Sequence, residues 1–170
     1  MLIGVAVLIA VILVFAAFRP DTFSVERSAT IKAAPEKIFP LINDFHQWDA
    51  WTPYNKDREM KKTYSGAASG VGASSAWMGN REVGEGSITI TESVPPTRIA
   101  MDLQMLKPFN CRNRVEFTLI PIGDATTVRW AMSGKSNFVS KLMGLFFNMD
   151  KMVGQDFETG LAGLKRLAEK

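Results

Sequence analysis

The chain has 170 residues, a formal net charge of +3, one cysteine and one histidine. Because the charge is small and basic residues are interleaved with acidic ones, we expect no nucleic-acid-binding surface. Cys111 has no second cysteine with which to form an intramolecular disulfide, and one cysteine with one histidine cannot build a structural zinc site. We expect neither a metal nor a cofactor.

Residues 1–18 contain no charged side chain and are followed at once by Arg19 and Pro20. Their length is at the lower limit for a helix that spans a bilayer, so we predict a transmembrane anchor at 1–18. A cleaved signal peptide is the alternative, but the basic amino-terminal region of such a peptide is missing. The positive residues Arg19, Arg27 and Lys32 downstream favour a single-pass membrane protein whose domain faces the cytoplasm.

After a short linker at 19–22, we predict a single ligand-binding domain over residues 23–170. Residues 23–33 alternate apolar and polar side chains, which is typical of a half-buried strand. Residues 34–45 begin with a proline in the first turn and place apolar residues at helical spacing. This pattern predicts a short helix, which Pro40 should kink or shorten.

Six short strand-like runs follow, separated by glycine, proline or asparagine turn signals. Apolar residues repeat with period two in four of these runs, so one face of the predicted sheet is apolar. Close spacing of successive strands predicts an antiparallel meander. The six runs are 60–66, 73–80, 85–94, 97–106, 111–121 and 126–135.

Residues 137–170 have no strand alternation, and their apolar residues recur on one helical stripe, which predicts a long C-terminal helix. Gly154, Gly160 and Gly163 weaken such a helix, so we expect them where a larger side chain would hold the helix off the sheet. Residues 138–149 are apolar nearly all round, which favours burial over the sheet edge, with a membrane-contacting lid as the alternative.

Together these elements predict an α+β domain in which a curved seven-stranded antiparallel sheet wraps the long C-terminal helix. Strong curvature of such a sheet separates it from the helix more at the centre than at the ends. We therefore expect an elongated apolar cavity between the sheet and the helix, where a ligand would bind.

The element order and three segments, 31–53, 84–99 and 148–170, resemble the START-like, helix-grip superfamily. Within it they are most similar to bacterial polyketide cyclase/dehydrase and lipid-transport domains of the SRPBCC group. The resemblance covers essentially residues 22–170. It implies a pocket for a hydrophobic small molecule or lipid, but it implies no reaction, and no catalytic residue can be carried over.

We expect the pocket walls to be aromatic, aliphatic and methionine side chains, because thioethers adapt to varied apolar shapes. A period of two from Ile88 and Ile90 points Glu92 inward, where an unpaired carboxylate would be costly. Either Glu92 pairs, with Arg112 or Arg114 as the candidate partner, or the strand ends or bulges before it. We expect Glu92 with Arg114 to form a polar anchor inside the cavity. The predicted ligand-binding residues are Trp51, Trp77, Glu92, Met101, Leu103, Arg114, Phe117, Trp130, Met152 and Val153.

The segment 45–56 concentrates aromatic residues and the only histidine at the bend between the predicted helix and sheet. A plug that closes one end of the core is favoured over a ligand wall, because aromatic clusters are more often core. His46 has no convincing partner in the sequence, so we predict no catalytic residue. Phosphate-binding, nucleophile-elbow, zinc-protease and dinucleotide motifs are all missing from the sequence.

The leading hypothesis is a membrane-anchored carrier or sensor of a hydrophobic molecule, a binder rather than an enzyme. One alternative is a cyclase or dehydrase acting on a polyketide-like substrate, in which Glu92 or His46 moves a proton. Another is a protein-interaction module that resembles chaperone-activator relatives of the same superfamily.

Overall fold

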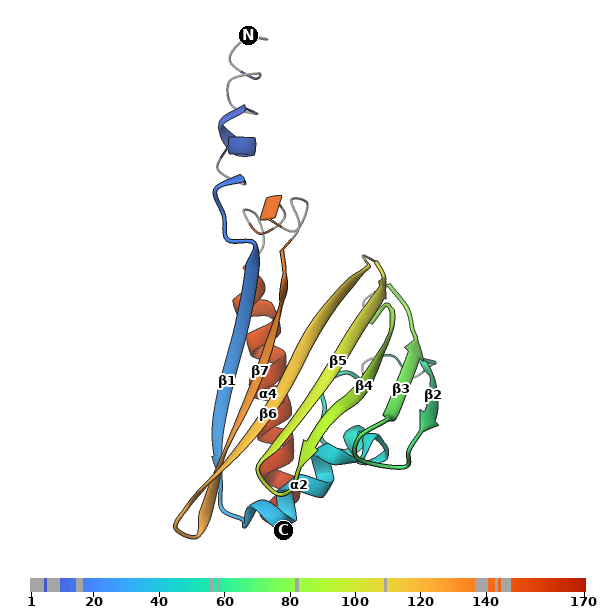
Figure 1. Cartoon of the computed structure of the whole chain (residues 1–170), viewed down its shortest axis with the longest axis vertical. Helices are drawn as coiled ribbons and strands as arrows, with labels where there is room; N and C mark the ends of the chain where they lie inside the picture. Colours follow the sequence, from blue (N-terminus) through green and yellow to red (C-terminus); the bar gives the residue numbers. More distant parts are fainter. Residues whose placement is uncertain are drawn as a thin grey trace.

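The fold is seen in a computed structural model, which describes residues 5, 10–14, 17–55, 57, 59–81, 83–108, 110–136, 141–142, 144 and 148–170. Among these residues the structure has seven strands, the α-helices α2 and α4, one 3-10 helix and a short helical stretch at 10–14 (Figure 1). In chain order the named elements are β1 (Thr22–Ile31), α2 (Pro35–Asn43), η1 (Phe45–Ala50), β2 (Lys61–Gly66), β3 (Ala73–Met78), β4 (Glu85–Val94), β5 (Arg98–Lys107), β6 (Cys111–Ile122), β7 (Ala125–Lys135) and α4 (Met149–Ala168).

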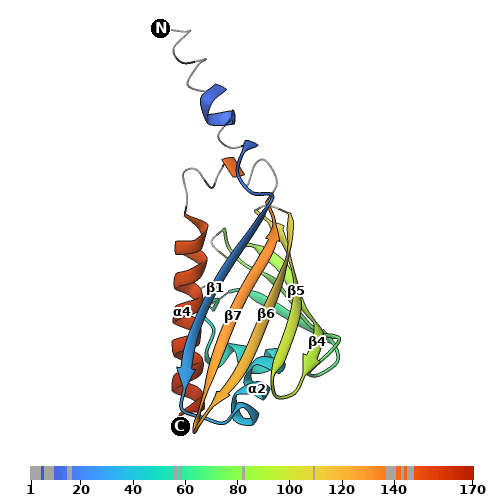
Figure 2. The same cartoon turned by 60° about the vertical axis from the view of Figure 1, so that its left-hand side comes forward.

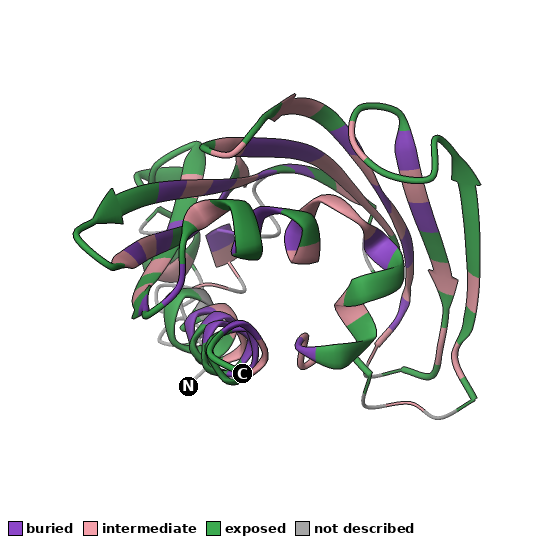
Figure 3. Ribbon diagram, turned by 90° about the horizontal axis from the view of Figure 1, so that it is seen from below, coloured by how far each residue is buried: buried purple, intermediate pink, exposed green. Residues whose placement is uncertain are grey.

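The strands form one antiparallel sheet in the order β1-β7-β6-β5-β4-β3-β2. Strands β2 to β7 are a meander, and β1 joins it at the β7 edge. The sheet curves around the helices, and α4 lies against β1 on the concave side (Figures 2 and 3). The α+β architecture therefore fits the predicted helix-grip arrangement of a seven-stranded sheet around a C-terminal helix.

The prediction of a transmembrane helix is not confirmed by the structure. Among the described residues, no helix is both long enough and apolar enough to cross a membrane. The anchor at 1–18 and the single-pass location facing the cytoplasm are therefore wrong; residues 1–4, 6–9 and 15–16 lie outside the described residues.

The concave face of the sheet carries the apolar core. On β6 and β7 the buried apolar side chains alternate as the period of two predicts, whereas β5 buries Ile99, Ala100 and Met101 in a row. Helix α4 adds Phe157, Leu161 and Leu164 from its inner face. Every second residue of a strand faces the same side, so this alternation defines which side chains face the helix.

A bulge in β4 changes the face on which Glu92 lies. Ile90 pairs with Met101, but Glu92 pairs with Ala100, so Thr91 is an extra residue in the ladder. Glu92 therefore follows the outward-facing register of Ala100 and lies on the convex face of the sheet. The bulge that the sequence left open as an alternative is present.

The helix glycines lie at close contacts, as predicted for Gly154 and Gly160. A Cβ atom on Gly160 would come within 2.7 Å of the Trp130 ring, and one on Gly154 within 2.1 Å of the Arg27 guanidinium. Gly163 instead lies against the backbone of Trp51, whose carbonyl oxygen would be 2.4 Å from an added Cβ. These glycines let α4 approach the sheet and η1 closely. The predicted apolar stretch at 138–149 falls largely outside the described residues.

Candidate ligand-binding site

Aromatic rings fill the space beneath the middle of α4. Phe157 of α4 stacks on Trp130 of β7, with ring centroids 4.1 Å apart and an angle of 11° between the planes. Phe117 lies 4.8 Å from Trp130, and Trp51 lies 5.7 Å from it. All four rings are at most 4% exposed. A ligand therefore cannot lie at this place without displacing side chains.

The segment that follows α2 acts as the plug that the sequence favoured. Trp48 and Trp51 donate their indole N–H groups to the carbonyl oxygens of Ile42 and Leu41, at 2.9 and 3.0 Å. These carbonyls belong to the last turn of α2, where backbone acceptors have no partner within the helix. The two tryptophans thus tie η1 to α2 and close this end of the core; Lys56, at the end of the predicted segment, lies outside the described residues.

The predicted ligand-binding residues fall into four groups. Trp51, Met101, Phe117 and Trp130 are buried in the core. Trp77, Leu103 and Val153 are half-buried and pack against that core. Met152 is 56% exposed on α4. Glu92 and Arg114 lie on the convex face, away from the others.

Glu92 and Arg114 do form the predicted pair, but as part of a surface network. The Arg114 guanidinium lies 3.4 Å from the Glu92 carboxylate and 3.5 Å from that of Glu116. Arg98 contacts the same two carboxylates, at 3.3 and 3.2 Å. These four side chains are 25 to 49% exposed, so they stabilise the outer face of the sheet rather than a ligand.

The half-buried residues Trp77 and Leu103 continue the apolar surface from the core towards β3. Trp77 lies over Gly86 of β4, because a Cβ atom there would come within 2.7 Å of its ring. Leu103 lies opposite Asn113 on β6. We name Trp77 and Leu103 the apolar strip; these side chains border the filled core and retain exposed surface. Val153 also borders the core, but from α4, which lies against β1.

Asn113 was missed by sequence reasoning. Its side chain is only 7% exposed, and its Oδ1 atom accepts no hydrogen bond from the residues that the structure describes. The period of two through Val115, Phe117 and Leu119 extends back to Asn113 and would have placed this amide on the apolar face. A buried acceptor without a partner is a rare and costly feature.

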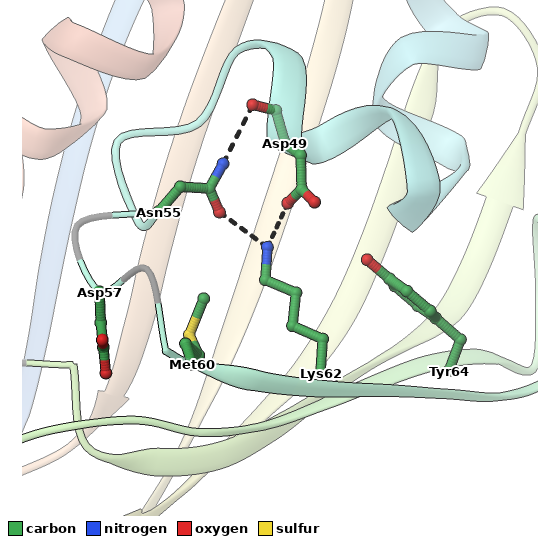
Figure 4. A pocket seen from close by; sticks show the side chains of 6 residues that line it. All are labelled: Asp49, Asn55, Asp57, Met60, Lys62 and Tyr64. Atoms are coloured by element: carbon green, nitrogen blue, oxygen red, sulfur yellow. Dashed lines mark hydrogen bonds and ion pairs between the residues drawn. The ribbon is translucent and has the colours of Figure 1, made fainter.

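A polar hollow of about 480 Å³ at the β2 edge of the sheet was missed as well (Figure 4). Lys62 rises from β2 and donates to the Asn55 side-chain oxygen at 2.7 Å and to the Asp49 carboxylate. Burial, with the Asp49 and Asp44 carboxylates nearby, raises the pKa of Tyr64, so its phenol stays protonated at neutral pH. The lining residues are Asp49, Asn55, Asp57, Met60, Lys62 and Tyr64.

His46 has the partner that the sequence did not reveal. Its Nδ1 atom lies 2.8 Å from the Asp44 carboxylate, and its ring packs on Tyr64 with centroids 4.2 Å apart. The imidazole is half exposed. Asp44 also accepts a hydrogen bond from the His46 backbone at 2.9 Å, so this pair forms the first turn of η1.

A curved antiparallel sheet, a gripped C-terminal helix and half-buried apolar side chains on the concave face define a START-like domain. The family model for polyketide cyclase / dehydrase and lipid transport matches residues 22–169, and the chain belongs to this family. Its fold is one that binds hydrophobic ligands. No curated protein sequence matches the chain.

Solved structures share the fold at low sequence identity. A protein from Chromobacterium violaceum has a TM-score of 0.62 at 15% identity, over 89% of this chain and 99% of its own. A protein from Thermobifida fusca has a TM-score of 0.63 at 20% identity, over 85% and 92%. A protein of the dynemicin biosynthetic locus has a TM-score of 0.60 at 16% identity, over 89% and 48%.

Proposed function

We propose that this protein binds a hydrophobic small molecule or lipid on the concave face of its sheet, for transport or sensing. The observation that carries the proposal is the apolar strip, Trp77 and Leu103, which remains partly exposed beside a filled aromatic core. Membership of a family described by polyketide chemistry and lipid transport supports the same function.

The proposed ligand lies beside the aromatic cluster rather than under the middle of α4. There Trp130 and Phe157 already occupy the space between sheet and helix. These rings would form one wall of the site, with Trp77 and Leu103 as its floor. Covering on the order of 100 Å² of this apolar surface would contribute about 2.5 kcal/mol to binding.

Mass spectrometry of organic extracts from the purified protein tests the proposal, together with uptake of a fluorescent fatty alcohol. We expect an enriched apolar species in the extract and saturable uptake of the probe. Purified protein that yields no apolar species and takes up no probe contradicts the proposal.

Leu103→Gln should weaken binding of the fatty alcohol at least about fivefold, equal to about 1 kcal/mol. Leu106→Gln is the matched control, since Leu106 is an exposed leucine of the same strand on the alternate face. Equal affinities of the two variants would remove Leu103 from the site.

A second candidate function is a cyclase or dehydrase acting on a polyketide-like substrate. It is supported by His46, because a carboxylate partner such as Asp44 orients an imidazole for proton transfer. Glu92 is no longer a candidate base for this reaction, since it lies on the convex face. Turnover of a polyketide chain that is unchanged in His46→Gln would reject the role of His46.

A further inference from the structure

The polar hollow at the β2 edge is continuous with the concave face. Lys62 lies directly opposite Trp77 in the β2–β3 ladder, and Tyr64 lies opposite Ser75. Directly opposed residues of an antiparallel pair project to the same side of the sheet, so Lys62 and Tyr64 share the side of Trp77. The hollow therefore begins where the apolar strip ends.

The wall opposite β2 comes from η1 and the chain after it. Asn55 donates from its amide to the Asp49 backbone oxygen at 3.0 Å, which places its own side-chain oxygen against Lys62. Asp57 accepts backbone N–H groups of Glu59 and Asn80, at 2.9 and 2.8 Å. These contacts hold hydrogen-bond acceptors around the hollow.

Among the lining residues that the structure describes, the charge balance of the hollow is negative. Asp49 and Asp57 contribute two carboxylates, while Lys62 contributes one ammonium group. That ammonium already binds Asp49 and Asn55, so its charge is compensated. An anionic group entering the hollow would meet a net negative charge, whereas a hydrogen-bond donor would find carboxylate and amide oxygens.

We propose that this hollow receives the polar end of an amphipathic ligand, and that this end donates hydrogen bonds and carries no negative charge. The apolar part of the same molecule lies over Trp77 and Leu103. The inference rests on the proposed function, because it assigns a polar end to the ligand held on the concave face. It names the class: chains that end in an ammonium or in sugar-like hydroxyl groups, rather than fatty acids.

Three probes of equal chain length test the head-group preference: dodecylammonium, dodecyl glucoside and dodecanoate. Each is titrated below its micelle concentration against the intact protein carrying a fluorescent apolar dye. We expect dodecylammonium and the glucoside to displace the dye at concentrations about tenfold lower than dodecanoate does. Equal displacement by all three probes, or a preference for dodecanoate, overturns the inference.

Two variants of the hollow should move the preference in opposite directions. Asp49→Asn releases Lys62 from its carboxylate partner, so dodecanoate should gain about tenfold relative to dodecylammonium. Lys62→Gln leaves Asp49 uncompensated, so dodecylammonium should gain instead. Each variant tests the head-group preference independently. If one of them does not fold, the other still provides the test.

Asp124→Asn is the control, since this carboxylate is 80% exposed in the turn between β6 and β7. It should leave the ratio of the three affinities unchanged. A preference that stays the same in both hollow variants contradicts the inference even if the wild type prefers dodecylammonium. Dye uptake without head-group discrimination rejects the hollow alone, whereas failure of dye and probes to bind rejects the proposed function itself.

Discussion

Two buried polar side chains on the inner face of the sheet differ in whether they are satisfied. Thr126 is fully buried and donates to the Ala33 carbonyl at 2.7 Å. Asn113 is almost as buried, yet its Oδ1 atom has no donor among the described residues. A buried polar group without a hydrogen-bond partner destabilises the folded protein, whereas a buried polar group that is hydrogen-bonded contributes modestly to its stability.

We therefore expect Asn113→Leu to leave the free energy of unfolding unchanged or to raise it by about 1 kcal/mol. Thr126→Val should lower it by about 1 kcal/mol or more, because the Ala33 carbonyl loses its donor. Urea unfolding followed by tryptophan fluorescence measures both. A large loss of stability in Asn113→Leu would show that its amide makes a contact that matters.

At the scale of elements, the position of α4 depends on its glycines, which have no side chain and so permit close contacts. Gly163 faces the Trp51 carbonyl oxygen, which is backbone and cannot turn away as a side chain can. Alanine is the better helix former by about 1 kcal/mol, so helix propensity alone predicts that Gly163→Ala stabilises the protein.

We predict the reverse: Gly163→Ala should lower the free energy of unfolding by about 1–3 kcal/mol, because an added Cβ atom forces α4 away from η1. Ala162→Gly, on the exposed side of the same turn, isolates the propensity effect and should cost about 1 kcal/mol. A stabilised Gly163→Ala variant would mean that α4 is less tightly packed than the contact requires.

The amino-terminal half of α4 is held to β1 by charge. Arg27 binds Asp150 at 3.0 Å and Glu158 at 2.8 Å, and its guanidinium lies over Gly154 between them. The hydrogen bond from Arg27 holds the pKa of the Asp150 carboxyl below its ordinary value. A carboxyl whose pKa is lowered by folding stabilises the protein above its unfolded pKa of about 3.9 and loses that effect as the pH falls.

Arg27→Gln should accordingly be less stable than the wild type at neutral pH, and the difference should shrink as the pH is lowered through about 4 towards 3. Urea midpoints measured across this range check the expectation. A difference between wild type and variant that is independent of pH would indicate that Arg27 acts through packing rather than through its ion pairs.

At the scale of the whole molecule, the core of the described residues begins with Val25 and ends with Ala168. The described apolar residues before β1, such as Val11, Val14 and Phe18, are 47 to 87% exposed. We propose the predicted boundary after residue 18 as a folding boundary, with residues 19–22 linking to the domain at 23–170.

Removal of residues 1–18 should leave the domain folded, with a melting temperature within about 3 °C of the full chain, because none of the described residues in this segment belongs to the buried core. Circular dichroism and thermal unfolding of residues 19–170 measure this. A fall of about 10 °C or more would mean that the removed segment packs on the domain.

The strands and the terminal helix were predictable because their signals are local. Alternation at period two and turn residues mark β4 to β7, and the stripe that includes Phe157, Leu161 and Leu164 marks α4. The face of Glu92 was not predictable, because a single extra residue at Thr91 reverses the alternation without changing the composition of the strand.

The sequence by itself determined the α+β class, the antiparallel meander and the gripped helix, since periodicity and turn chemistry act between residues close in the chain. The tertiary structure alone decided that Trp51, Phe117, Trp130 and Phe157 fill the space under α4. It also decided that Asp49 and Asn55 close over Lys62. Both outcomes depend on side-chain packing between segments far apart in sequence, whose distances no local pattern encodes.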